Sequence, residues 1–168
     1  MNILEQIKLK AASSKYLEFS NILGEVGKWG FSWNAPVTQI EIEKLEKENG
    51  IFLPSEYKKF LSISNGATLF ETPGEESGYK FLGINEIISS TEEMRQWGYD
   101  LREDWFVFMK VLFSSDVLIF DISKKDTNKY IIDGDVGYPV REWTYLSGGV
   151  DKLFARIYQC NGSMYWRW

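Results

Sequence analysis

The chain has 168 residues, with 19 lysines and arginines against 24 aspartates and glutamates, no histidine and one cysteine. This length suits a single domain, residues 1–168, which can bury enough surface to fold without a disulfide or a metal. The lack of histidine excludes Ser-His and Cys-His catalytic pairs and histidine-ligated metals, and one cysteine excludes an intrachain disulfide. We therefore expect no enzyme and no cofactor, and the net charge of −5 disfavours nucleic acid as a partner.

The N-terminal part of the chain, residues 1–35, is predicted to be a helical extension. Apolar residues spaced three and four apart predict a helix over residues 3–12. A pair of serines can cap a second helix over residues 14–23. Aromatic residues then alternate with smaller ones from Trp29 to Trp33, a pattern typical either of a short strand or of a loop held down by its rings.

Two successive helices have the clearest signals in the chain. Thr38 and Glu41 form a capping box at the start of the first, which ends at Asn49 and Gly50 because glycine takes a left-handed conformation at low cost. Pro54 suits the first position of the second helix, where its missing N–H would be unpaired anyway. The apolar face and the glycine-containing end of this second helix consist of Tyr57, Phe60, Leu61, Asn65 and Gly66.

The rest of the chain is predicted to combine strands with two helices, which makes the fold class α+β. Runs of β-branched and aromatic residues between turn residues predict strands at 79–82, 105–113, 117–122, 129–132 and 138–146. Helical spacing predicts helices at 85–96 and 150–159. Pro139 places the last strand at an edge of the sheet, and the aromatic tail, residues 163–168, is expected to pack, for example as an edge strand.

Several polar groups could carry chemistry, but each has a simpler structural explanation. Asp133 and Asp135, with Asp121 and Asp126 near them in sequence, could gather a hard cation. They lie at predicted turns, however, where aspartate commonly accepts hydrogen bonds from the local backbone. We interpret them as turn residues and Cys160 as a structural thiol, and we expect no metal site.

The negative charge is concentrated in one segment. Residues 71–104 carry nine acidic and three basic residues, and the rest of the chain is almost neutral. Such a segment is typical either of a solvated surface or of an interface with a basic partner, for which tryptophan and tyrosine are common anchors. The candidate partner-binding residues are Glu71, Glu75, Glu76, Trp97, Tyr99, Asp100, Glu103, Asp104 and Trp105.

The stretch from Ile42 to Gly66, IEKLEKENGIFLPSEYKKFLSISNG, resembles the opening motif of the SUKH superfamily, which includes the yeast cell-wall assembly regulators of the Smi/Knr type. KFLGINEII resembles its strand-then-helix element, VLIFDIS its strand ending in an aspartate, here Asp121, and GGVDKLFARIY its closing helix. The resemblance covers residues 38–160. It implies a central mixed, mostly antiparallel sheet flanked by N-terminal helices and a C-terminal helix. We interpret the motif residues as fold-determining: Leu53, Pro54, Tyr57, Phe60, Leu61, Asn65 and Gly66.

The resemblance implies a binding protein. Bacterial members are implied to be immunity proteins, which bind and neutralise a toxin delivered by neighbouring cells, such as a nuclease or a deaminase. A nuclease presents a basic surface to nucleic acid, so an acidic inhibitor can occlude it. The alternative is a non-enzymatic intracellular regulatory adaptor of the Smi/Knr type. We expect a protein toxin as the partner, no nucleic acid or membrane, and a cytoplasmic location, because no segment is typical of a signal peptide or a membrane span.

Overall fold

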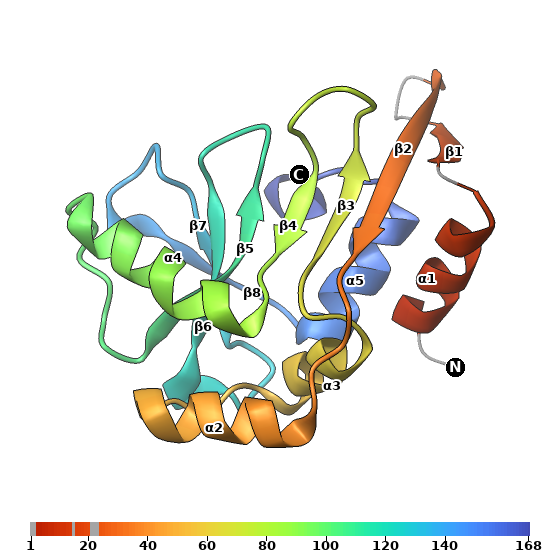
Figure 1. Cartoon of the computed structure of the whole chain (residues 1–168). Coiled ribbons are helices and arrows are strands. Elements are labelled where there is room, and N and C mark those ends of the chain that lie inside the picture. The colour runs from red at the N-terminus through yellow and green to blue at the C-terminus, as the bar shows by residue number, and fades with distance from the viewer. Residues whose placement is uncertain (1–2, 15, 21–23) are drawn as a thin grey trace.

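One antiparallel sheet organises the chain (Figure 1). A computed structural model describes residues 3–14, 16–20 and 24–168. Within them the sheet has eight strands, and each strand pairs with its neighbours in sequence, so the order is a simple meander. The strands are β1 (Tyr16–Ser20), β2 (Val26–Trp33), β3 (Ala67–Glu71), β4 (Tyr79–Phe81), β5 (Trp105–Val111), β6 (Val117–Asp121), β7 (Ile131–Gly134) and β8 (Thr144–Leu146). The fold is α+β as predicted, but all these pairings are antiparallel, so the described sheet is not mixed.

Helices cover both faces of the sheet. They are α1 (Ile3–Ser13), α2 (Gln39–Asn49), α3 (Ser55–Ile63), α4 (Ile84–Gln96) and α5 (Val150–Gln159). On one face α4 lies along β5, where the N–H of Val107 donates a hydrogen bond to Oγ1 of Thr91 at 2.9 Å. On the other face α3 and α5 contribute rings to the core. Figure 1 shows α2 and α3 at one end of the strands, with α1 beside β1 and β2.

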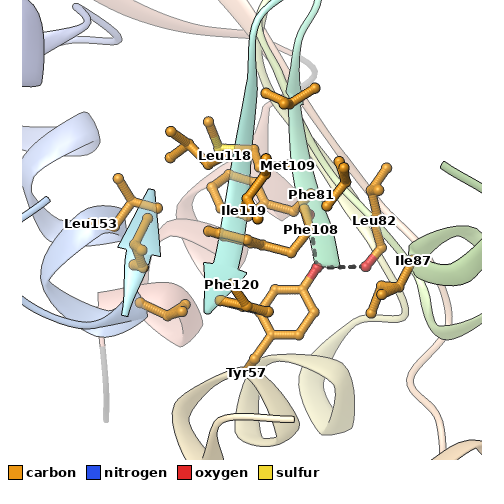
Figure 2. Close-up of a cluster of buried hydrophobic side chains, with 14 of the residues drawn as sticks. Tyr57, Phe81, Leu82, Ile87, Phe108, Met109, Leu118, Ile119, Phe120 and Leu153 are labelled. Carbon is orange, nitrogen blue, oxygen red and sulfur yellow. Dashed lines mark hydrogen bonds between the residues drawn. The ribbon is translucent and has the colours of Figure 1, made fainter. Parts of the chain in front are cut away.

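The core against which α3 packs combines aromatic rings with aliphatic side chains, as Figure 2 shows. Phe108 and Phe120 stack with ring centroids 3.8 Å apart. The hydroxyl of Tyr57 donates to the carbonyl oxygens of Leu82 at 2.6 Å and Phe108 at 3.1 Å. At this point the chain leaves β4, turns away from β5 and begins α4. The carbonyl oxygen of Leu82 therefore lacks a partner in the sheet, and the hydroxyl of Tyr57 supplies its hydrogen bond. Of the other motif residues, Leu53, Pro54, Phe60, Leu61 and Gly66 are buried, and Asn65 is half-buried.

Most helices agree with the sequence predictions. The helices predicted at 3–12, 85–96 and 150–159 correspond to α1, α4 and α5. The capping box is present in α2, and its Gly50 is left-handed. The end of α3 differs, because Ser64 is an extended C-cap and the left-handed Gly66 lies beyond it, at the turn into β3.

The N-terminal extension contains strands where a helix was expected. The helix predicted over 14–23 is wrong at residues 16–20, which form β1, whereas positions 15 and 21–23 lie outside the described residues. Phe19 of β1 packs against Trp29 and Phe70, with ring centroids 6.1 and 5.3 Å away. This long-range ring packing outweighs the local capping signal. The alternating aromatics belong to β2, so they form a strand rather than a loop.

The C-terminal predictions need smaller corrections. The turn predicted at Asp133 and Gly134 begins later, because both residues belong to β7. The last strand is only β8, at the sheet edge, and Pro139 precedes a short 3-10 turn outside it. The tail forms a 3-10 turn over Tyr165–Arg167 rather than a strand. Strand β3 was not predicted.

Candidate functional site

Alternate connections of an antiparallel meander lie at the same end of the sheet, because successive strands run in opposite directions. The β3–β4, β5–β6 and β7–β8 connections, residues 72–78, 112–116 and 135–143, therefore share one end (Figure 1). We call this end of the sheet the turn end. The name includes the three hollows between and beside these connections, which are described next. Helices α2 and α3 and the β6–β7 connection lie at the opposite end.

Carboxylates line three hollows at the turn end. The first, of about 500 Å³, lies between β2 and the β3–β4 connection. The second, of about 240 Å³, lies between that connection, α4 and the β5–β6 connection. The third, of about 280 Å³, lies beside the β7–β8 connection. The acidic residues that line them are Glu71, Glu75, Glu76, Glu93, Asp116, Asp133, Asp135 and Glu142.

A tight turn presents the acids of the β3–β4 connection. The N–H of Glu75 donates to the carbonyl of Thr72 at 3.1 Å, with Pro73 and the left-handed Gly74 between them. Proline followed by glycine at these positions is the type II arrangement. Glu75 and Glu76 are exposed, and neither forms an ion pair with a described residue. Their charges are therefore available to a partner.

Trp97 lines the second hollow together with Glu76. It is the C-cap residue of α4, and 62% of its surface is exposed. Glu93, one turn earlier on α4, pairs with Lys110 of β5 at 2.9 Å and fixes the wall of the hollow. The floor is apolar, and it is formed by Met94, Val111, Leu112 and Val117. This arrangement brings two of the predicted partner-binding residues together.

The guanidinium of Arg167 joins the carboxylates behind the turn end. It donates to Asp133 at 2.9 and 3.0 Å and to Asp116 at 2.9 Å, and it lies 3.2 Å from Asp135. Hydrogen bonding to Asp133 raises the pKa of Arg167 above its ordinary value. Because Asp116 and Asp133 are buried, they need this cation to offset their desolvation.

The four aspartates weighed as a cation site do not converge. Asp133 and Asp135 contact Arg167, whereas Asp126 pairs with Lys125 at 2.7 Å on an exposed connection. Asp121 lies at the far end of β6. Within residues 3–14, 16–20 and 24–168, no group of three or more acidic or cysteine side chains is arranged to hold a metal ion.

The other predicted residues of segment 71–104 lie away from the second hollow. Tyr99 packs against Trp143, with ring centroids 5.8 Å apart, and is half-buried. Asp104 is engaged by Arg102 at 2.8 Å. Asp100 and Glu103 are exposed on the connection that precedes β5. Trp105 is 9% exposed and belongs to the core, so it presents little surface to a partner.

Sequence reasoning missed part of the turn end. Phe113 and Tyr138 are 55% and 59% exposed on the β5–β6 and β7–β8 connections. Asp135 and Glu142 line the third hollow. The prediction followed one contiguous acidic segment, whereas the fold gathers acids from three separate turns. The available signal was the regular alternation of predicted strands, which places every second connection at one end.

The opposite end of the sheet carries charges of both signs, with glutamates on α2 and lysines on the β6–β7 connection. Lys124, Lys125 and Lys129 lie on the β6–β7 connection, residues 122–130.

Asp121 is fully buried at the same end of the sheet and accepts hydrogen bonds from Tyr145 at 2.6 Å and from Ser123. Burial alone would raise the pKa of Asp121, but these hydrogen bonds hold it below its ordinary value. The carboxylate therefore stays charged inside the protein.

Comparisons with known proteins identify relatives. A model of the SMI1 / KNR4 family (SUKH-1) matches residues 36–149. Two Bacillus subtilis (strain 168) proteins, both described as uncharacterized, are similar. YobM is 28% identical over 137 residues, which cover 76% of this chain and 69% of YobM. YnaB is 24% identical over 136 residues, which cover 81% of this chain and 86% of YnaB. In the described part of the chain, no helix has the length and apolar character needed to cross a bilayer.

Proposed function

The chain belongs to the SMI1/KNR4 family, and from this premise we propose that it is an immunity protein. It binds a toxin delivered by neighbouring bacterial cells and neutralises it by covering the toxin's active surface. The toxin is a protein with a basic surface, such as a nuclease or a deaminase. Binding alone accounts for neutralisation, so this function requires no catalytic group and no cofactor.

The observation that carries the proposal is the turn end. Glu75 and Glu76 are exposed there without an ion pair to a described residue, and Trp97 is exposed beside them. Buried tryptophans and charged rims are common in tight protein–protein interfaces. A nuclease must hold phosphates on basic residues, and an acidic surface is complementary in charge to those residues.

The distribution of charge also orients the encounter. Acids lie at the turn end, and the lysines of the β6–β7 connection lie at the opposite end. Because the opposite end carries the glutamates of α2 as well as these lysines, a basic partner is attracted mainly to the turn end, which raises the rate of productive encounters. The type II turn and the ion pair of Glu93 with Lys110 hold the surface in shape before binding.

Co-expression tests this function. Where a neighbouring reading frame encodes a toxin-like C-terminal domain, bacterial cells would express that domain with and without this chain, and survival would be counted. We expect survival to be restored by the chain and by a control variant carrying Glu43→Lys and Glu48→Lys on α2, at the opposite end. If cells die equally with and without the chain, the immunity function is wrong and the regulatory adaptor becomes the better account.

A further inference from the structure

We propose that the second hollow of the turn end receives one arginine side chain of the partner. This inference rests on the proposed function, since it assumes that the partner is a protein with a basic surface. It goes further because it names the side chain that is recognised and the residues that recognise it.

The size of the hollow fits a single side chain. Its volume is about 240 Å³, whereas pockets for small-molecule ligands usually range from about 300 to 1,000 Å³. The walls come from four parts of the fold: the β3–β4 connection, α4, β5 and the β5–β6 turn with the start of β6. A side chain entering here is enclosed on several sides rather than laid on a flat surface.

The lining matches both parts of an arginine. Leu112, which is half-buried, and the exposed ring of Trp97 offer apolar surface to the three methylene groups of the stem, whereas Met94, Val111 and Val117 line the hollow but are buried. At the mouth, the carboxylate of Glu76 can accept the guanidinium, and the exposed ring of Trp97 can stack on it. A carboxylate, an aromatic face and an apolar floor together favour a long cationic side chain over an acidic or a purely apolar one.

The carboxylates of the hollow are not equally available. Glu93 is held by Lys110, and Asp116 by Arg167, each at 2.9 Å. Glu76 has no ion pair with a described residue. Glu76 is therefore the carboxylate left for an incoming cation, and the two engaged acids keep the walls in place.

The chain itself contains the same combination elsewhere. The guanidinium of Arg102 lies 5.8 Å from the ring centre of Trp105 and donates to Asp104 at 2.8 and 3.0 Å. Arginine suits this arrangement better than lysine, because its planar group can stack on a ring and bind a carboxylate through two N–H groups at once. The hollow offers the ring and the carboxylate without the arginine.

Titration with capped tripeptides tests the inference without any toxin. The peptides acetyl-Gly-Arg-Gly-amide, its lysine counterpart and its uncharged citrulline counterpart would be added to the labelled protein. NMR would follow the indole N–H of Trp97 and the backbone amide of Glu76. We expect saturable shifts of both signals with the arginine peptide, binding weaker by about threefold or more with lysine, and no saturable shift with citrulline.

Two isosteric variants provide the comparison. Glu76→Gln should weaken binding of the arginine peptide by about threefold or more. Glu75→Gln is the matched control, because Glu75 lines the first hollow and not the second; its affinity should remain that of the native protein. Equal effects of the two variants, or equal binding of arginine and citrulline peptides, would overturn the inference. Because no toxin is present, that failure would leave the proposed function standing.

Discussion

The hydroxyl of Tyr57 donates a hydrogen bond to the carbonyl oxygen of Leu82, 2.6 Å away, and joins α3 to the point where α4 begins. Asn65 acts at the same place, since its Oδ1 accepts from the N–H of Ile84 at 2.8 Å. These two motif residues lie far from the turn end, but they fix the start of the helix whose other end carries Trp97. The motif thus supports the candidate site by positioning α4.

Tyr57→Phe should lower the free energy of unfolding by about 1–3 kcal/mol, because it leaves a buried carbonyl oxygen without its donor. Urea unfolding measures the change. Tyr138→Phe is the matched control, since Tyr138 is 59% exposed and its replacement should change stability by less than about 0.5 kcal/mol. Equal effects of the two substitutions would show that the buried hydrogen bond contributes nothing.

Stability should fall at alkaline pH. Burial raises the pKa values of Tyr57, Tyr79 and Tyr130. In the unfolded chain tyrosine titrates near pH 10, so above that pH the unfolded state releases protons that the native state keeps. The contribution of these tyrosines to stability is therefore constant below about pH 10 and decreases above it, by up to about 1.4 kcal/mol per pH unit for each tyrosine. Urea unfolding between pH 8 and 11 should show a smaller decrease in Tyr79→Phe than in the native protein. If stability decreases with pH equally steeply in Tyr79→Phe and in the native protein, the raised pKa of Tyr79 is contradicted.

Two glycines of the β3–β4 connection should respond differently to alanine. Both have positive φ, +82° at Gly74 and +92° at Gly78. A Cβ at Gly74 meets open space, whereas a Cβ at Gly78 collides with the carbonyl oxygens of Leu69 and Phe70. Gly74→Ala should cost about 1 kcal/mol, from the left-handed conformation alone. Gly78→Ala should cost clearly more, and a thermal unfolding series that ranked them the other way would contradict the described turn.

Arg167→Gln should destabilise the protein by about 1–3 kcal/mol, because it leaves the buried carboxylates of Asp116 and Asp133 without their cation. The control is Arg141→Gln, whose side chain is 81% exposed and pairs with Glu142 at 3.6 Å. That change should cost less than about 0.5 kcal/mol. Urea unfolding at two salt concentrations compares them, and a similar loss from both variants would argue against a stabilising role for Arg167.

The sequence predicted local structure better than long-range placement. The capping box and the motif around Tyr57 are short-range signals, and both helices they predict are present. Strand β1 was assigned to a helix because its stabilising partner, β2, pairs with it only in the folded chain. The candidate site was likewise predicted only where its residues are close together in the sequence. Glu76 and Trp97 were found within one acidic segment, but Asp135 and Tyr138 join them only through the order of the strands.

The most direct test of the account is the rate and affinity of toxin binding by a charge-reversed protein. The variant Glu75→Lys with Glu76→Lys should slow association about tenfold or more and lose most of the salt dependence, because it inverts the charge that steers a basic partner. The control Glu43→Lys with Glu48→Lys makes the same charge change on α2 and should bind nearly as the native protein does. Stopped-flow association measured from 50 to 300 mM salt gives both quantities. If both variants bind the toxin as fast as the native protein, the turn end is not the surface that recognises it.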